Sequence, residues 1–484
     1  MNCAPWHHLH GIQDFILRQS SAMHIHILGI CGTFMGSLAV LAKELGYKVT
    51  GSDQNVYPPM STQLEEQGIV LSQGYDPAHF TGTDNTPDLI VIGNTCSRGN
   101  PAVEYVLDNN LPYCSGPQWL SDHVLQDRWV LAVAGTHGKT TTTSMLTWIL
   151  EHAGLEPGYL VGGVPKNFAC SARLGKKPFF VIEADEYDSA FFDKRSKFIH
   201  YHAKTCIMGN LEFDHADIFP DLAAIQTQFH HLMKTIPRSG VVIAPFGNAN
   251  LDTVFAKGVW CEQEFFSLSG EEGAHWQVEK LDRQGAHFQV SDCTQSGEVQ
   301  WSLLGDHNIQ NGIAALAAAA HAGVSLAEGC AALSVFEGVK RRLELLGEFG
   351  GVKVYDDFAH HPTAIKTTLD GFRARLDENN DPGRLLCVIE ARSNTMKMGY
   401  HQQTLAAALT AADLVIWYKS EETRLDLDAI GEQAQTAFHS MTTTDNIIAA
   451  VTREARPGDH LVIMSNGGFE GIHRRIGEAL ENAG

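Results

Sequence analysis

The chain has 484 residues, 44% of them hydrophobic and 19% charged, a composition typical of a globular protein with about three domains. Its 35 basic residues against 56 acidic ones give a formal net charge of −21, which argues against a nucleic-acid partner because phosphate backbones require a basic surface. Ten scattered cysteines without a Cys-x-x-Cys pair indicate reduced thiols in a cytoplasmic protein rather than a disulfide framework.

Residues 1–22 lack the basic start and cleavage site of a signal peptide, so we expect an N-terminal extension before the first domain. Segment 23–128 alternates strand and helix patterns, which predicts a Rossmann-like domain with a parallel sheet covered by helices. The apolar stretch 25–42 is interrupted by glycines, so it is better explained by a buried strand and a packed helix than by a membrane span. We therefore expect no membrane partner.

A glycine turn follows the first strand of this segment at Gly29 and Gly32, and Asp53 ends the second strand, where an acid could bind a ribose. The turn departs from the G-x-G-x-x-G pattern. It is explained nearly as well by close helix–strand packing without a ligand. These three residues are candidate substrate contacts.

The most informative segment is Gly-Thr-His-Gly-Lys-Thr at 135–140, between an apolar run at 129–134 and a helical pattern from Thr141 onward. Glycines let the backbone approach a phosphate, and the N-terminus of a helix favours an anion. Lys139 is placed to reach the β- and γ-phosphates, and the Thr140 hydroxyl to bind magnesium. The loop is shorter than G-x-x-x-x-G-K-[ST], yet its flanking strand and helix predict an ATP-using enzyme. Its expected nucleotide contacts are Gly135, Thr136, His137, Gly138, Lys139, Thr140 and Thr141.

Segment 129–342 continues with strands at 178–183, 205–209 and 240–244, a polar region at 262–304 with short antiparallel strands, and a helix at 312–321. We therefore predict a central P-loop ATPase-like domain with a mostly parallel sheet and a small antiparallel part. Acidic clusters at 183–188 and 210–217 follow two strands, whose carboxyl ends should face the phosphate loop. Glu183 and His215 are candidate magnesium ligands, although each cluster alone is more often a solvated loop.

Segment 343–484 shows four further strands, at 352–356, 384–390, 413–417 and 460–464, with helical patterns between them. This predicts a second Rossmann-like domain. The chain as a whole is thus expected to be a three-domain α/β protein.

Six separated motifs resemble those of the Mur ligases, a family of ATP-dependent amide-forming enzymes that act on UDP-N-acetylmuramyl substrates. The resemblance covers the chain from Met23 onward, in the order typical of the family. The motifs are 135–140, Glu183-Ala-Asp-Glu186, Asn210 to His215, Gly305 to Asn311, Lys340 to Glu344 and Asp356 to Thr363.

The resemblance implies that ATP activates a carboxylate as an acyl phosphate, with Lys139, Arg342 and His361 as catalytic residues. It implies that Thr140, Glu183 and His215 bind Mg²⁺, and it adds four nucleotide contacts. An alternative explanation for Asn308 and Asn311 is helix capping. The alternative for Arg342 is a surface ion pair with Glu344 or Glu348. The added contacts are Asn308, Asn311, Arg342 and Asp357.

One departure from the family is His230, which stands where some members carry a carbamylated lysine. The L-alanine-adding branch also lacks that lysine, so its absence points toward that branch. How the second metal site is completed stays open. Segment 392–399 further resembles members of that branch that join the tripeptide L-alanyl-γ-D-glutamyl-meso-diaminopimelate to UDP-N-acetylmuramate. Arg392, Ser393 and Asn394 are accordingly candidate contacts for a substrate carboxylate, or else an exposed loop at a strand end.

Three other functions are compatible with parts of the sequence. UDP-N-acetylmuramate–L-alanine ligase shares the expected fold and first substrate. A dinucleotide-dependent oxidoreductase would use the Gly29 turn but leaves Lys139 unexplained, and a non-catalytic UDP-sugar-binding protein would turn over no ATP. We expect a monomer or a weak homodimer.

Overall fold

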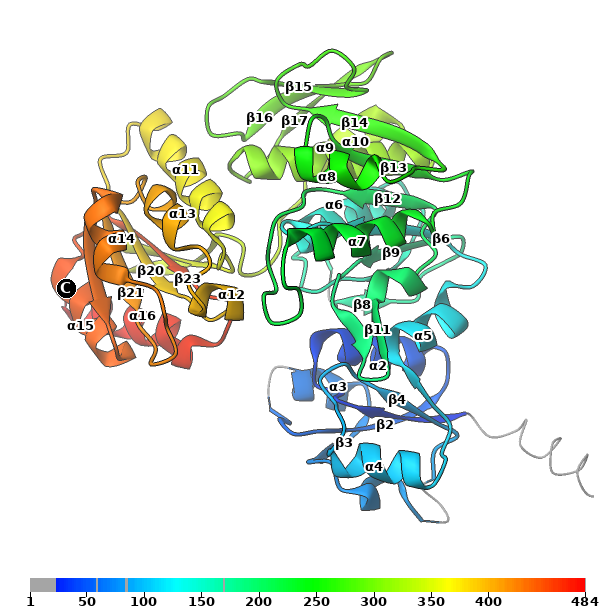
Figure 1. Ribbon diagram of the computed structural model, residues 1–484. Helices are drawn as coiled ribbons and strands as arrows, with labels where there is room; N and C mark the ends of the chain where they lie inside the picture. Colours follow the sequence, from blue (N-terminus) through cyan, green and yellow to red (C-terminus); the bar gives the residue numbers. More distant parts are fainter. Residues whose placement is uncertain (1–22, 58–59, 83–85, 169, 484) are drawn as a thin grey trace, which may run out of the picture.

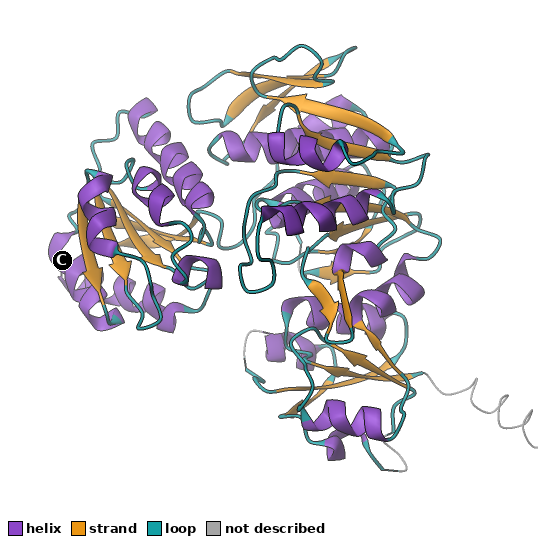
Figure 2. Ribbon diagram, viewed as in Figure 1, coloured by secondary structure: helices purple, strands orange, loops and turns teal. Residues whose placement is uncertain are grey.

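Three large β-sheets organise the computed structural model, which describes residues 23–57, 60–82, 86–168 and 170–483. The first two sheets belong to units that lie end to end, and the third belongs to a C-terminal unit beside the middle one (Figure 1). Helices flank each sheet (Figure 2). The predicted N-terminal extension, residues 1–22, lies outside the described residues.

The N-terminal sheet has five parallel strands in the order β3-β2-β1-β4-β5, the order found in Rossmann-type sheets. Its central strand β1 is buried along its whole length. The glycine turn follows β1 at its carboxyl end, and Asp53 is the last residue of β2. The elements are β1 (His24–Leu28), α2 (Thr33–Glu44), β2 (Lys48–Asp53), α3 (Met60–Glu66), β3 (Val70–Gln73), β4 (Leu89–Ile92), α4 (Pro101–Asp108), β5 (Tyr113–Ser115) and α5 (Gly116–Leu120).

The middle sheet has ten strands in the order β17-β16-β15-β14-β13-β12-β6-β9-β7-β8, parallel from β7 through β15. A separate hairpin is formed by β10 and β11. The strands are β6 (Trp129–Ala134), β7 (Gly158–Leu160), β8 (Ala172–Arg173), β9 (Phe179–Glu183), β10 (Asp188–Ala190), β11 (Asp193–Ser196), β12 (Thr205–Met208), β13 (Val241–Pro245), β14 (Glu262–Ser267), β15 (Trp276–Lys280), β16 (His287–Ser291) and β17 (Ser296–Gln300). The helices are α6 (Lys139–His152), α7 (Leu222–Met233), α8 (Ala249–Phe255), α9 (Asp306–His321) and α10 (Leu326–Ser334).

The C-terminal sheet has six strands in the order β18-β19-β23-β20-β21-β22, all parallel except β18. Separate apolar clusters cover its two faces. Its strands are β18 (Glu344–Phe349), β19 (Val352–Asp357), β20 (Leu385–Glu390), β21 (Leu414–Tyr418), β22 (Ala437–Met441) and β23 (His460–Met464). Its helices are α11 (Pro362–Glu378), α12 (Asn394–Lys397), α13 (Gln402–Ala408), α14 (Leu427–Ala434), α15 (Thr444–Glu454) and α16 (Ile472–Ala483).

The three-domain α/β architecture confirms the predicted fold class, and two local predictions need correction. Strand β14 was expected to be antiparallel but pairs in parallel with both β13 and β15; within this region the antiparallel pairs are β15–β16 and β16–β17. Helix α9 begins at Asp306, six residues before the predicted start at Gly312. Gly312 lies within the helix, at a position where a Cβ would approach Trp301 to 2.9 Å.

Contacts between the middle and C-terminal units run along the loop that follows β12. Thr395 at the start of α12 donates a hydrogen bond to Asp214 (2.9 Å) and accepts one from the backbone of Ala216 (3.2 Å). The rings of Phe213 and Tyr400 pack edge to face nearby.

Among the residues that the structure describes, no helix has the length and apolar character needed to cross a bilayer.

Candidate active site

The phosphate-loop segment lies at the centre of the middle sheet, between the two acidic clusters. Strand β6 pairs with β9 on one side and β12 on the other. The turn from β6 into α6 uses Gly135 at φ +143° and Gly138 at φ +76°, backbone conformations that glycine adopts without strain. Both clusters therefore flank the N-terminus of α6, as the sequence predicted from parallel strands.

Lys139 is fixed by a chain of charged groups. Its Nζ donates to the Gly135 carbonyl at 2.7 Å and lies 3.0 Å from Glu186 Oε2. The other oxygen of Glu186 accepts a hydrogen bond from Nε2 of His215 at 3.0 Å, and Tyr187 lies 2.6 Å from His215 Nδ1. Burial alone would lower the pKa of Lys139, but the carboxylates around it raise that pKa, so the ammonium stays charged.

Thr140 and Glu183 form a second group of oxygen atoms beside the loop. The Thr140 hydroxyl donates to Glu183 Oε1 at 3.0 Å, and the backbone N–H of Gly162 donates to Glu183 Oε2 at 2.7 Å. Burial raises the pKa of Glu183 despite these bonds and the charge of Lys139. A carboxylate and a hydroxyl at this point suit a hard cation such as Mg²⁺.

His137 is clamped by the neighbouring loop, an arrangement that sequence reasoning did not identify. Its backbone N–H donates to Asn210 Oδ1 at 2.7 Å, and Asn210 Nδ2 donates back to the His137 carbonyl at 3.0 Å. Its ring Nε2 lies 3.3 Å from Glu212 Oε2. Glu212 also accepts a hydrogen bond at 2.7 Å from Thr363 of the C-terminal unit.

Two of the predicted residues of the C-terminal unit reach this site from the end of β19 and the start of α11. Asp357 accepts backbone hydrogen bonds from Leu343 (2.7 Å) and Ala359 (2.8 Å), and burial raises its pKa. His361 caps α11, and its ring lies 4.3 Å from that of His137. Burial lowers the pKa of His361 to about 3, so its imidazole is neutral.

Arg342 lies on the segment that links the middle and C-terminal units. It lines the cavity, with its guanidinium 5.1 Å from the centre of the Phe358 ring, rather than forming the surface ion pair considered as an alternative. Its neighbours Arg341 and Leu343 both have left-handed backbones, at φ +60° and +50°. Non-glycine residues rarely adopt this conformation.

Asn308 and Asn311 lie in the first two turns of α9, opposite the phosphate loop. Asn308 Nδ2 donates to the Leu304 carbonyl at 2.7 Å, which is not the helix-capping bond considered as an alternative, because Gly305 is the N-cap of α9 and no described side chain caps the helix there. Asn311 lies against Gly138, where a Cβ would come within 2.5 Å of its Oδ1. Both asparagines line the same cavity.

These groups surround one cavity of about 750 Å³ between the middle and C-terminal units, which Thr33 at the start of α2 also lines. The predicted substrate residues lie outside its lining. Arg392 and Asn394 are exposed at the end of β20, and Ser393 caps α12. The lining includes Thr136, His137, Gly138, Lys139, Thr140, Thr141, Glu183, His215, Asn308, Asn311, Arg342, Asp357 and His361.

The glycine turn of the N-terminal unit is held by a hydrogen bond to the end of β2. Asp53 accepts a hydrogen bond from the backbone N–H of Cys31 at 2.9 Å, so the end of β2 is tied to the turn. Gly29 has φ +79°, and Gly32 directly precedes α2. Thr33 is next to Gly32, so the turn is adjacent to the main cavity.

His230 does not lie among the residues that line the cavity. It belongs to α7, where its ring packs 5.9 Å from that of Trp260. The acidic residue next to Lys139 and His215 is Glu186, which was predicted as part of a motif but not as a site residue. Asn210 and Glu212 were overlooked in the same way.

Models of known protein families match most of the chain. The matches are "Mur ligase family, catalytic domain" at residues 24–128, "Mur ligase middle domain" at 133–319 and "Mur ligase, glutamate ligase domain" at 341–467. The chain therefore belongs to the Mur ligase family and is a ligase, which confirms the resemblance inferred from its motifs.

Individual relatives cover nearly the whole chain. A UDP-N-acetylmuramate–L-alanyl-gamma-D-glutamyl-meso-2,6-diaminoheptandioate ligase from Escherichia coli is 55% identical over 95% of this chain and 98% of its own length. The crystal structure of a murein peptide ligase from Psychrobacter arcticus is 49% identical, with a TM-score of 0.73 over 95% of this chain and 99% of its own. A UDP-N-acetylmuramate–L-alanine ligase from Acetivibrio thermocellus is 29% identical over 93% of this chain and 95% of its own length.

Proposed function

We propose that this enzyme joins UDP-N-acetylmuramate to the tripeptide L-alanyl-γ-D-glutamyl-meso-diaminopimelate in an ATP-dependent reaction, during murein recycling. The observation that carries the proposal is the contrast in identity. The Escherichia coli relative with the tripeptide-ligase name is 55% identical, whereas the Acetivibrio thermocellus relative with the L-alanine-ligase name is 29% identical, over similar shares of the chain.

ATP is proposed to bind at the loop from Gly135 to Thr141, with Asn308, Asn311 and Asp357 as further contacts. The chemistry of the residues supports this: a charged lysine lies among flexible glycines at a helix N-terminus, within a cavity of about 750 Å³. Mg²⁺ fits the oxygen atoms of Thr140 and Glu183, and His215 is proposed to hold a second ion. When bound, Mg²⁺ would neutralise charge on the phosphates.

In the proposed reaction the lactoyl carboxylate attacks the γ-phosphorus of ATP, giving an acyl phosphate and ADP. The alanyl amine of the tripeptide then attacks the acyl carbon and expels phosphate. Lys139 and Arg342 stabilise negative charge on the transferred phosphoryl group, and much of the remaining catalysis is positioning. His361 is neutral and its Nε2 has no hydrogen-bond partner among the described residues, so we assign it to orient the amine.

We propose that residues 23–128 bind the UDP-sugar, residues 129–342 bind ATP and residues 343–484 bind the acceptor. Gly29, Gly32 and Asp53 are the proposed contacts of the first substrate, next to the point where Thr33 enters the cavity. Arg392, Ser393 and Asn394 are proposed to bind an acceptor carboxylate. Exposed polar groups at the end of a parallel strand support that role.

The test is ADP release by the full chain with UDP-N-acetylmuramate and Mg²⁺ ATP. L-Alanine, L-alanyl-γ-D-glutamate and the tripeptide are compared as acceptors at equal concentrations. We expect kcat/KM to be at least about a hundredfold higher for the tripeptide, because each carboxylate bound by a charged hydrogen bond contributes a few kcal/mol. A preference for L-alanine would instead assign the chain to the rival activity.

A cytoplasmic location and a monomer or weak homodimer complete the proposal. The cysteines that the structure describes are all unpaired, which agrees with a reducing compartment. Light scattering coupled to gel filtration tests the oligomeric state: a stable dimer at nanomolar concentration would contradict it.

A further inference from the structure

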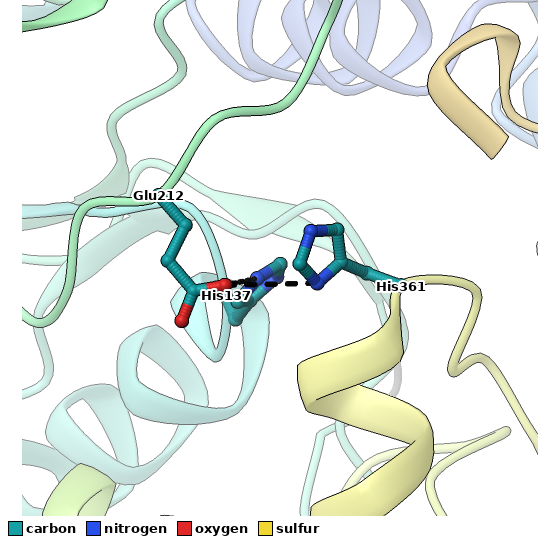
Figure 3. A group of neighbouring side chains, drawn as sticks. All are labelled: His137, Glu212 and His361. Atoms are coloured by element: carbon teal, nitrogen blue, oxygen red, sulfur yellow. Dashed lines mark hydrogen bonds and ion pairs between the residues drawn. The ribbon is translucent and has the colours of Figure 1, made fainter. Parts of the chain in front are cut away.

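Three side chains from separate segments converge between the middle and C-terminal units. They are His137 of the phosphate loop, Glu212 of the loop after β12 and His361 at the start of α11. One nitrogen or oxygen atom of each lies within 4.8 Å of the corresponding atom of the other two. Figure 3 shows the two imidazoles and the carboxylate pointing toward one another.

The distances in this cluster are close to those of a metal site. Glu212 Oε2 lies 3.3 Å from His137 Nε2 and 3.7 Å from His361 Nδ1. Ligands at about 2.1 Å from a tetrahedral metal ion lie about 3.4 Å from one another. Every pair of donor atoms in the cluster lies within 4.8 Å, so an ion at the centre requires side-chain shifts only where a pair is farther apart than about 3.4 Å.

Each member of the cluster is held in place by other contacts. Asn210 clamps the backbone of His137, and the Thr136 hydroxyl accepts a hydrogen bond at 2.9 Å from the backbone N–H of Glu212. Thr363 donates to the Glu212 carboxylate at 2.7 Å. These contacts preorganise the three side chains, and preorganisation reduces the entropic cost of binding an ion.

Two buried ring nitrogens near this cluster have no hydrogen-bond partner among the described residues. Nε2 of His361 is buried without a hydrogen-bond partner among the described residues, although only 5% of the residue is exposed. Nε2 of the adjacent His401, whose ring lies 4.3 Å from that of His361, is in the same condition. Buried polar groups without partners are uncommon. In His361 the nitrogen that faces Glu212 is the other one, Nδ1, which accepts a hydrogen bond from the backbone N–H of Thr363 at 3.3 Å, and a bound ion would replace that bond.

We propose that His137, Glu212 and His361 bind a borderline divalent transition-metal ion, represented by Zn²⁺, with water or His401 completing the shell. Two imidazoles and one carboxylate are a donor set that Zn²⁺ prefers, whereas Mg²⁺ prefers oxygen atoms alone. This site is separate from the oxygen group of Thr140 and Glu183 that the proposed function assigns to Mg²⁺.

The ion would act as an inhibitory latch between the two units. His137 and Glu212 belong to the middle unit and His361 to the C-terminal one, so a bound ion fixes their relative position. It also occupies Nδ1 of His361 inside the cavity, so Nε2 must carry the ring proton and can no longer accept one from the amine, the group that the proposed function has this ring orient. Zn²⁺ at low concentration should therefore inhibit the ligase in the presence of excess Mg²⁺.

The primary test needs neither nucleotide nor turnover. Zn²⁺ is titrated into the metal-free full chain in competition with a chromophoric chelator, and Co²⁺ absorption reports the coordination geometry. We expect one tight site that millimolar Mg²⁺ does not displace. Removing groups that only support metal ligands costs 10- to 100-fold in affinity, so His361→Ala and Glu212→Gln should each weaken binding by about a hundredfold or more.

Two controls separate this inference from the proposed function. Glu183→Gln removes the proposed Mg²⁺ ligand and should leave Zn²⁺ affinity unchanged. His202→Asn changes an exposed histidine outside the cluster and should also bind normally. Zn²⁺ binding by His361→Ala at wild-type affinity would overturn the inference, as would the absence of a site in the wild type, whatever the acceptor assay shows.

Discussion

The ammonium of Lys139 and the carboxylate of Glu186 lie 3.0 Å apart, and only 13% and 2% of their side chains are exposed. Burial alone would raise the pKa of Glu186, but Lys139 and the hydrogen bond from His215 hold it below its usual range. The positive charge beneath the phosphate loop is thus kept in place by a buried negative one. Removing either partner leaves an unpaired buried charge, which is costly.

We predict that Lys139→Ala lowers the rate of ADP formation by about a thousandfold or more, because charge stabilisation of the transferred phosphoryl group is lost. Glu186→Gln should have a smaller effect, since the lysine remains but is less well held. The measurement is kcat under saturating substrates. The control is Lys176→Ala, which removes an exposed ion pair with Glu156; a Lys139→Ala enzyme as active as this control would contradict the assignment.

The contact between Gly138 and Asn311 gives a second prediction with a closely matched control. Gly138 and Gly154 share φ +76°, but a Cβ at Gly154 meets nothing within 4 Å. Gly154→Ala should therefore cost only about 1–2 kcal/mol of stability, from the left-handed backbone. Gly138→Ala should cost more, and should lower activity at least tenfold by displacing Asn311.

Thermal unfolding and ADP release of both variants are the measurements. Adding Asn311→Ala to Gly138→Ala should recover the stability difference between the two glycine variants. Equal melting temperatures for Gly138→Ala and Gly154→Ala would show that the contact does not matter.

Glu183 should control the magnesium requirement. We predict that Glu183→Gln raises the Mg²⁺ concentration for half-maximal activity at least tenfold, because a charged oxygen ligand becomes a neutral one. Thr140→Ser keeps the hydroxyl and should remain close to wild type. Glu151→Gln, which disturbs the ion pair with Arg173 instead, is the matched control. An unchanged Mg²⁺ dependence in Glu183→Gln would place the ion elsewhere.

The N-terminal sheet should lose stability in mild acid because of His26. Its ring bonds to Thr50 and Ser52, and burial together with His24 and His79 lowers its pKa to about 3. Between that value and 6.5 the unfolded state binds a proton that the folded state does not, so stability falls as pH falls. The loss from pH 6.5 to pH 5 is about 2 kcal/mol.

The measurement is hydrogen–deuterium exchange of β1 and β2 at pH 6.5 and pH 5, corrected for intrinsic rates. His26→Asn removes the titrating group and should make protection less dependent on pH, whereas His202→Asn should not. Equal pH dependence in wild type and His26→Asn would assign the effect to other groups.

The local parts of the site could be predicted because they are contiguous in sequence. The loop from Gly135 to Thr140 lies directly between a strand and a helix, Glu183 ends β9, and His215 follows β12; both strands are adjacent to β6. Strand β14 was misjudged because a polar alternating pattern indicates one exposed face of a strand but not its direction. The direction depends on pairing with β13, which local sequence does not encode.

Contacts across the two units could not be read from the sequence. Thr363 and Glu212 are 151 positions apart, and their hydrogen bond depends on how the units dock. The buried Glu186 was obscured for a different reason: an acid in a run of acids is usually solvated, and only the position of Lys139 shows that this one is not.

Arg342 is both a cavity-lining cation and part of the covalent link between the middle and C-terminal units, flanked by left-handed residues at 341 and 343. Under the proposed function, the residue that contacts the γ-phosphate therefore also lies in the segment that joins the C-terminal unit to the middle one. A phosphate group that contacts the Arg342 guanidinium would therefore also act on the linking segment at residues 341–343. Under the proposed function, changes to this link made to alter the reach of the C-terminal unit would alter nucleotide binding too, and an inhibitor that binds Arg342 would also restrain the C-terminal unit.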